Sequence, residues 1–297
     1  MAIINYKYYS GTDEYSDGDI ENDIVGYFKK YGDKKLEKVF KKDDRWATFY
    51  HLTPLRKNIL NTYNFTPDST ALEIGAGFGA ITGVLCDNCK KVTAVELSKR
   101  RAEGLFARHE KRENLEVIVG NLNDIDFEEK FDYVTLIGVL EYALSFTKDA
   151  NPYETFLGNI RPLLKPNGKL LIAIENRYGL KYWCGAGEDH TGKPFDGING
   201  YKNVDFVRTF GKAELTELLN SCGFNTINFF YPYPDYKMPL AVFSDDNLPT
   251  EESLKSIVDP HPYPNPVIPD EKKLIPSLVK NGVFPFFSNS FLVEATF

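Results

Sequence analysis

The spacing of hydrophobic residues changes character near residue 70. Before it, Ile20, Ile24 and Phe28 recur every four residues, and Leu52–Leu60 forms a second amphipathic stretch, so helices are expected there. After it, short apolar runs alternate with polar or helical stretches, which is typical of parallel strands covered on both faces. The predicted strands are 70–77, 91–97, 115–120, 131–140, 169–176, 225–234 and 288–297.

This order predicts an α/β fold of the Rossmann-like type, with a seven-stranded, mostly parallel sheet. The last strand is expected to pair antiparallel beside the sixth. We expect an N-terminal helical extension over 1–65 and a core over 66–244 and 286–297. Residues 245–285 are rich in proline and lack a period, which predicts an irregular insertion.

Bulk composition excludes several classes of protein. The chain has 297 residues and a formal net charge of -7. Electrostatic binding to nucleic acid requires a basic surface, so this charge argues against it. It has no apolar run near the ~20 residues that cross a bilayer, and its first residues do not resemble a signal peptide. Cys86 and Cys89 form a CxxC motif without a second ligand pair, so no metal site is expected. These features predict a cytoplasmic protein without membrane insertion.

A glycine-rich turn carries the clearest chemical signal. In LEIGAGFGAIT, Gly75, Gly77 and Gly79 follow a predicted strand and open a helix, where α/β sheets bind ligands. The same letters also satisfy a dinucleotide fingerprint, so the loop alone does not decide the cofactor. Glu73 lies near the end of the predicted strand 70–77. Dinucleotide-binding folds generally have an apolar residue at this position. Glu96 ends the next strand, where a carboxylate can accept the hydroxyls of a ribose.

Two further motifs follow in order: VLEY, which contains Glu141, and LLKPNGKLL. With E-x-G-x-G-x-G and the acidic end of strand two, the chain resembles the class I S-adenosylmethionine-dependent methyltransferases over about residues 70–240 and the final strand. The resemblance implies S-adenosyl-L-methionine as cofactor. Asn121 stands where the family commonly has aspartate near the adenine. The implied cofactor-binding residues are Glu73, Gly75, Ala76, Gly77, Gly79, Glu96, Leu97, Asn121, Leu122, Gly138 and Leu140.

A long irregular segment, 174–201, follows the fifth predicted strand. It is rich in glycine and aromatic residues, and a segment of this kind in a compact chain is usually functional. Together with stretches of the N-terminal region, it resembles methyltransferase modules associated with bacterial cell-surface polysaccharide biosynthesis. That resemblance implies a sugar or other small hydroxyl-bearing acceptor and a possible glycosyltransferase partner.

A hydroxyl acceptor needs a base, and this segment offers Glu188, Asp189 and His190 as catalytic candidates. An imidazole titrates near neutral pH, which suits His190, although a histidine in a loop often only bonds the backbone. A further set could contact the acceptor or, for the first two, the cofactor carboxylate: His51, Arg56, Tyr142, Asn176, Tyr178 and Trp183.

Two other functions use the same residues. An NAD(P)-dependent oxidoreductase would bind its nicotinamide cofactor at the glycine loop. A non-catalytic module that binds S-adenosylmethionine and docks a glycosyltransferase would keep the loop and Glu96 without turnover. Binding of a nicotinamide cofactor would distinguish the oxidoreductase from a methyltransferase. Methyl transfer would distinguish a methyltransferase from the non-catalytic module.

Overall fold

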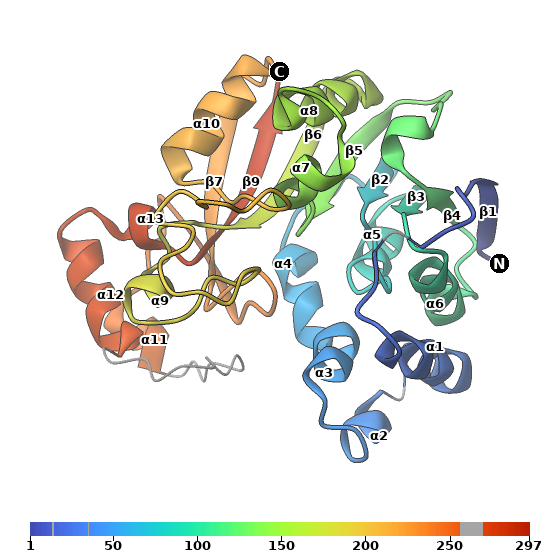
Figure 1. Cartoon of the computed structure of the whole chain (residues 1–297), viewed down its shortest axis with the longest axis horizontal. Helices are drawn as coiled ribbons and strands as arrows, with labels where there is room; N and C mark the ends of the chain where they lie inside the picture. Colours follow the sequence, from blue (N-terminus) through green and yellow to red (C-terminus); the bar gives the residue numbers. More distant parts are fainter. Residues whose placement is uncertain (14, 35, 256–269) are drawn as a thin grey trace. The chain divides into compact units, whose positions relative to one another are not determined.

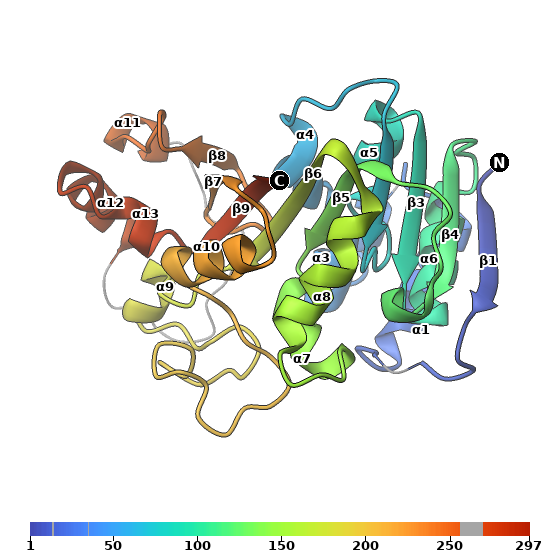
Figure 2. The same ribbon diagram turned by 90° about the horizontal axis from the view of Figure 1, so that it is seen from above.

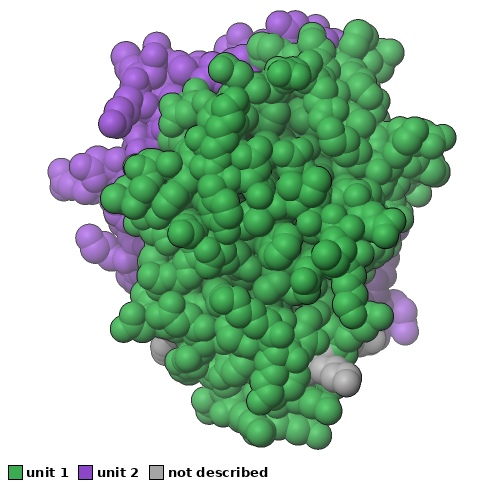
Figure 3. Space-filling view, turned by 90° about the vertical axis from the view of Figure 1, so that its right-hand side faces the viewer, with its two compact units in different colours: residues 1–137, 162–169 green, residues 138–161, 170–297 purple. Residues whose placement is uncertain are grey.

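The computed structural model describes residues 1–13, 15–34, 36–255 and 270–297. They form two compact units, which Figure 3 shows in different colours. The first unit contains residues 1–137 and 162–169, and the second contains residues 138–161 and 170–297. Each unit is described by itself below. Among the described residues, none of the helices has the length and apolar character that a membrane span requires.

The first unit is built on a parallel sheet with the strand order β1-β4-β3-β2-β5 (Figure 1). Its central strands are buried along most of their length and form an apolar interior, as expected for strands with both faces covered. The strands are β1 (Ile3–Tyr8), β2 (Thr70–Ile74), β3 (Lys91–Glu96), β4 (Leu115–Gly120) and β5 (Phe131–Ile137).

Helices α5 and α6 pack on β3 and β4, and α1 packs on α6 (Figure 2). The predicted period of α1 is confirmed, because Ile24 and Phe28 are buried in a cluster with Phe78. The helices of this unit are α1 (Ile20–Tyr31), α2 (Glu37–Phe40), α3 (Trp46–Leu52), α4 (Asn58–Asn61), α5 (Thr82–Asn88) and α6 (Lys99–His109), with the 3-10 turns η1 (Pro54–Lys57) and η2 (Leu122–Asp124).

The strands of the second unit follow the order β6-β9-β7-β8. They are β6 (Leu164–Glu175), whose first residues belong to the first unit, β7 (Thr226–Tyr233), β8 (Ala241–Ser244) and β9 (Ser290–Thr296). Strand β9 pairs antiparallel with β6 and with β7, which confirms the expected place of the last strand.

The helices of the second unit include α10, which follows the irregular segment and leads into β7 (Figure 1). They are η3 (Leu140–Tyr142), α7 (Ala143–Phe146), α8 (Pro152–Ile160), α9 (Leu180–Trp183), α10 (Lys212–Ser221), α11 (Glu251–Lys255), α12 (Glu271–Lys280) and α13 (Phe284–Phe287), while η4 (Arg161–Leu163) crosses between the units.

The expected α/β fold is confirmed, but the number of strands is wrong, because the described residues form nine strands rather than seven. The two additional strands are β1 and β8. Strand β1 lies in the segment expected to be helical, and it pairs parallel with β4. Its residues are mostly exposed or half-buried, so they lack the apolar alternation that would have revealed a strand.

The segment 245–285 also differs from the expected irregular insertion. Its described parts contain α11 and α12, and residues 256–269 lie outside the described part of the chain. Helix α12 begins at an N-cap, because the Asp270 side chain accepts a hydrogen bond from the Lys272 N–H. Glu271 and Ile275 form its buried side, while Pro276 lies inside it, which explains why the proline content masked the helix.

Candidate functional site

The glycine loop connects β2 to α5 and is tied to the neighbouring strand. The backbone N–H groups of Gly75 and Ala76 both donate to the Val95 carbonyl, at 2.9 and 3.1 Å. Val95 immediately precedes Glu96 at the end of β3. The loop and the acidic strand end are therefore held together by backbone bonds, as the order of the motifs predicted.

Two glycines of this loop have left-handed backbone conformations for different reasons. Gly77 has φ +55°, and a Cβ built on it would meet nothing within 4 Å, so open space lies beside it. Gly79 has φ +73°, and its Cβ would lie 2.9 Å from both His109 Cδ2 and Leu105 Cγ. A left-handed residue disfavours any side chain. The missing side chain of Gly77 thus leaves open space beside the loop, whereas the missing side chain of Gly79 allows His109 and Leu105 of α6 to pack against the loop.

Helix α6 holds the loop through two side chains, His109 and Arg108, that no motif had marked. His109 Nε2 donates to the Gly79 carbonyl at 2.8 Å, and Arg108 Nη1 donates to the Phe78 carbonyl at 3.2 Å. Burial and the adjacent Arg108 charge lower the pKa of His109 to about 4, so this imidazole is neutral. A buried histidine at a helix end carries no motif, so only the packing identifies it as a positioning residue.

The two predicted carboxylates lie on either side of this loop. Glu73 accepts a hydrogen bond from Thr82 Oγ1 at 2.6 Å, and burial raises its pKa to about 8. Glu96 accepts from the backbone N–H of Gly77 at 2.7 Å and of Ser98 at 2.9 Å, and burial raises its pKa as well. Each oxygen of a carboxylate can accept more than one bond, so Glu96 keeps acceptor capacity for a ligand.

The other predicted cofactor residues are divided between the units. Asn121 follows β4, and its side-chain oxygen accepts from the Asn123 N–H at 3.0 Å, which caps the turn η2. Leu122 is buried and Leu97 is half-buried in the same unit. Gly138 and Leu140 belong to the second unit, where Leu140 is buried.

His51 and Arg56 lie in the first unit beside the glycine loop. The His51 ring packs edge-on against Phe78 with centroids 4.9 Å apart, and Nε2 donates to Asp17 at 3.1 Å. Burial lowers the pKa of His51 to about 4. The Arg56 guanidinium covers the Tyr50 ring at 4.0 Å, while its buried Nε and Nη1 have no hydrogen-bond partner among the residues that the structure describes. Buried donors of this kind are usually satisfied, so Arg56 has unused capacity for an anion.

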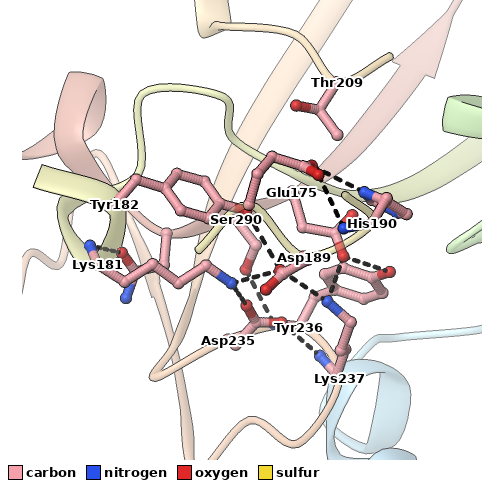
Figure 4. A network of polar contacts seen from close by, with 12 residues as sticks. Glu175, Lys181, Tyr182, Asp189, His190, Thr209, Asp235, Tyr236, Lys237 and Ser290 are labelled. Atoms are coloured by element: carbon pink, nitrogen blue, oxygen red, sulfur yellow. Dashed lines mark hydrogen bonds and ion pairs between the residues drawn. The ribbon is translucent and has the colours of Figure 1, made fainter. Parts of the chain in front are cut away.

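In the second unit, the catalytic candidates belong to a buried polar network (Figure 4). Glu188 Oε1 accepts from His190 Nδ1 at 2.9 Å and from the Tyr201 hydroxyl at 3.0 Å. Its other oxygen accepts from the backbone N–H groups of His190 and Thr191, both at 2.8 Å. These bonds lower the pKa of Glu188 against the effect of burial. Glu188 therefore orients His190 and is a poor proton acceptor.

Asp189 is held by lysines rather than presented to a ligand. Its Oδ2 lies 2.6 Å from Lys181 Nζ and 2.9 Å from Lys237 Nζ, and the two ammonium groups hold its pKa well below the ordinary value. Lys181, which is buried, also contacts Asp235 at 2.6 Å. These ion pairs give Asp189 a structural position, and the two lysines were not anticipated from the sequence.

Beside His190 lie two glutamates that the sequence analysis did not select as catalytic. Glu141 Oε1 is 4.0 Å from His190 Nε2, and single ligand atoms of Glu141, Glu175 and His190 all lie within 4.8 Å of one another. Both glutamates are buried, and the Oε2 atom of each has no hydrogen-bond partner in residues 1–13, 15–34, 36–255 and 270–297. Burial and the charge of Glu175 raise the pKa of Glu141 to about 8.

The remaining acceptor candidates do not all converge on this network. Tyr142 meets the His190 ring edge-on, with centroids 5.4 Å apart. Asn176 instead donates to the carbonyls of Phe286 and Ser288, both at 2.7 Å, which makes it a structural tie. Tyr178 stacks on Phe286, and Trp183, which is 45% exposed, donates to the Tyr178 carbonyl.

The fold and the glycine loop define an α/β domain of the nucleoside-binding type. Residues 72–172 match the family described as "Methyltransferase domain". A similar protein is a probable ribosomal RNA small subunit methyltransferase A of Methanosarcina acetivorans, which is 45% identical over 80 residues, 27% of this chain and 29% of that protein. The chain spans less than half the length of the first curated relatives that it matches.

Solved structures share the fold at low identity. A methyltransferase of Haloferax volcanii, solved with its activator Trm112, has a TM-score of 0.50 at 16% identity, covering 92% of this chain and 96% of that chain. Phosphoethanolamine N-methyltransferase 1 of Haemonchus contortus, in complex with phosphoethanolamine and S-adenosylhomocysteine, has a TM-score of 0.51 at 14% identity, covering 93% and 48%.

The match over residues 72–172 confirms the expected methyltransferase domain, and the two solved structures share its α/β fold. The match to a methyltransferase domain agrees with S-adenosylmethionine as the methyl donor, as the motifs predicted. The residues of the glycine loop and Glu96 stand in a geometry that fits such a ligand, because Gly77 opens onto free space and its N–H is bonded to Glu96.

Proposed function

We propose that the protein transfers the methyl group of S-adenosylmethionine to a hydroxyl of a sugar or another small hydroxyl-bearing acceptor. The observation that carries the proposal is the glycine loop of the first unit, where the Gly77 N–H donates to Glu96. The second unit, described by itself, holds a buried acid–histidine cluster. The first supplies a donor site, and the second supplies groups that can receive a proton.

The donor is proposed to bind along the glycine loop. Gly75, Ala76 and Gly77 would contact its methionine part, and Glu96 would accept hydrogen bonds from the ribose hydroxyls. Arg56 is the proposed partner of the donor's carboxylate, because its buried Nε and Nη1 have no hydrogen-bond partner beside this loop. A charge-assisted bond from a guanidinium to a carboxylate contributes about 1.5–3 kcal/mol.

The reaction itself is a direct displacement. A lone pair of the acceptor oxygen attacks the methyl carbon, the bond from that carbon to sulfur breaks, and neutral S-adenosylhomocysteine leaves. The hydroxyl proton is proposed to pass to the cluster of Glu141, Glu175 and His190. Because burial and the charge of Glu175 raise the pKa of Glu141 to about 8, Glu141 is mostly protonated at neutral pH. Its ionised form, which increases as pH rises toward 8, is the proposed proton acceptor. The raised pKa of His190, about 9, makes it a donor at neutral pH rather than the base.

The proposal of a sugar acceptor is based on aromatic side chains in the segment that follows β6. The half-exposed Trp183 and the exposed Phe195 lie with ring centroids 6.3 Å apart, and aromatic faces of this kind suit contact with a sugar ring. A role in bacterial cell-surface polysaccharide biosynthesis, a glycosyltransferase partner and a cytoplasmic location belong to the same proposal. The net charge of -7 argues against RNA as the acceptor, although a relative is named for ribosomal RNA.

The donor site is tested by calorimetry with S-adenosylhomocysteine. We expect binding to the wild type, and a loss of affinity of at least about tenfold in Glu96→Gln and Arg56→Gln, which corresponds to about 1.4 kcal/mol. Glu217→Gln, an exposed change on α10, is the control. Binding of NAD(P) in place of S-adenosylhomocysteine would support the oxidoreductase instead.

Turnover is tested separately with methyl-labelled S-adenosylmethionine. Sugar nucleotides and oligosaccharides, small amines and ribosomal RNA serve as acceptor classes in parallel reactions. Label in a sugar hydroxyl supports the proposal, and Glu141→Gln should then reduce the rate by about 10²–10⁴-fold if it receives the proton. Label in amines or RNA alone would contradict the proposed acceptor, and donor binding without any label would support a non-catalytic module.

A further inference from the structure

The cluster of Glu141, Glu175 and His190 lies within the second unit and combines three potential metal ligands. Its ligand atoms are within 4.8 Å of one another. Bonds of about 2.0–2.2 Å to a metal would place opposed ligands about 4.2 Å apart, so only small side-chain movements separate this arrangement from a bound cation. Glu175 and His190 come from segments on either side of α9, and Figure 4 shows them next to each other.

Two buried carboxylate oxygens at this place have no hydrogen-bond partner within the described part of the chain. They are the Oε2 atoms of Glu141 and Glu175, and the two residues are only 1% and 0% exposed. Lys237 Nζ and the Tyr236 hydroxyl both contact the other oxygen of Glu175. Buried charged oxygens without partners are costly, so the site is incomplete as it stands.

The orientation of His190 is the second observation. Its Nδ1 is held by Glu188, at 2.9 Å, and its Nε2 is left on the side of Glu141. A carboxylate that fixes one ring nitrogen while the other faces a ligand position is the usual surrounding of a metal-bound histidine. Glu188 is itself held by Tyr201 and by two backbone N–H groups, so the imidazole has little freedom to turn away.

The charges of the network also favour a cation. The five acids Glu141, Glu175, Glu188, Asp189 and Asp235 face the two lysines 181 and 237 and one histidine. Lys181 and Lys237 are engaged with Asp189, Asp235 and Glu175, so Glu141 has no lysine within ion-pairing distance among the described residues. A dication would offset the excess of acidic groups over lysines, which includes Glu141.

We propose that Glu141, Glu175 and His190 bind one divalent first-row transition metal ion. A mixed set of one imidazole and two carboxylates suits Mn²⁺, Fe²⁺ or Zn²⁺ better than Mg²⁺ or Ca²⁺, which prefer oxygen ligands alone. No metal site was predicted from the sequence, where only the cysteines had the spacing of metal ligands. Three protein ligands leave coordination positions open, and the hydroxyls of the acceptor could fill them; this last step rests on the proposed function.

The test uses the full chain, stripped with a chelator and titrated with MnCl₂. Electron paramagnetic resonance counts bound Mn²⁺ directly, and no cofactor or acceptor is added. We expect about one Mn²⁺ per chain, displaced by ZnCl₂, with Glu141→Gln and His190→Gln each weakening binding at least about tenfold. Glu217→Gln again serves as the control and should bind as the wild type does.

Folding is checked by the melting temperature of each metal-free variant. Glu141→Gln keeps the size of the side chain and its capacity for hydrogen bonds, so the metal-free protein should melt close to the wild type, and it should lose the upward shift that MnCl₂ gives the wild type. Less than half an ion per chain, or equal affinity in Glu141→Gln and Glu217→Gln, would overturn the inference. S-adenosylhomocysteine binding, measured on the same samples, fails only if the donor site fails.

Discussion

The packing of α6 against the glycine loop makes Gly79 the most sensitive position of the donor site. In Gly79→Ala, the new Cβ would lie 2.9 Å from His109 Cδ2 and 2.9 Å from Leu105 Cγ, on a residue with φ +73°. His109 cannot withdraw freely, because its Nε2 donates to the Gly79 carbonyl at 2.8 Å. The substitution therefore combines backbone strain with overpacking.

The magnitude follows from these two costs. A left-handed non-glycine residue costs about 1–2 kcal/mol. Forcing a methyl group into a packed site adds about 1–3 kcal/mol. We expect Gly79→Ala to lower the free energy of unfolding by about 2–5 kcal/mol. Gly77→Ala is the matched control, because φ is +55° there and nothing lies within 4 Å of the Cβ position, so only about 1–2 kcal/mol should be lost.

Denaturant unfolding and calorimetry with S-adenosylhomocysteine measure the two effects separately. Gly77→Ala should lose mainly ligand affinity, because its Cβ would enter the open space beside Glu96, and Gly79→Ala should lose mainly stability. In the double variant Gly79→Ala/His109→Ala, part of the steric cost should be recovered, as a coupling of about 0.5–3 kcal/mol. Equal destabilisation by the two single variants, without coupling to His109, would refute the proposed role of this contact.

Two further predictions concern buried charges. His109 has a folded pKa of about 4 against an ordinary 6.5, so its contribution to stability is complete above pH 6.5 and is lost as pH falls toward 4. At pH 5.5 this group should cost the wild type about 1.4 kcal/mol relative to neutral pH, and unfolding curves of His109→Gln should fall less steeply with acid. An unchanged slope would contradict a neutral buried imidazole. Lys181→Met should lower stability by about 3–5 kcal/mol, because it leaves Asp189 and Asp235 without their shared buried partner, and a loss below about 1 kcal/mol in a melt would show that Lys237 suffices.

The sequence by itself determined the donor side of the protein. Strands and the glycine loop are local features of the sequence. The apolar period predicts a strand. Three glycines and an acid at fixed spacing predict a turn and the ligand that it binds. Glu73, Gly77 and Glu96 lie together because adjacent parallel strands bring their carboxyl ends to one edge. Strand β1 was not predicted from the sequence, because its exposed and half-buried residues have no apolar alternation.

Only the tertiary structure decided which side chains form the acid–histidine cluster. Glu141, Glu175, His190 and Lys237 lie on separate segments of the chain, and no spacing rule connects them. The sequence pointed to Glu188, Asp189 and His190 as candidates and favoured His190, whereas the fold gives each a different task through its partners. The physical reason is desolvation: burial raises the pKa of Glu141 to about 8 and leaves carboxylate oxygens without partners, and neither effect exists until the chain has closed around them.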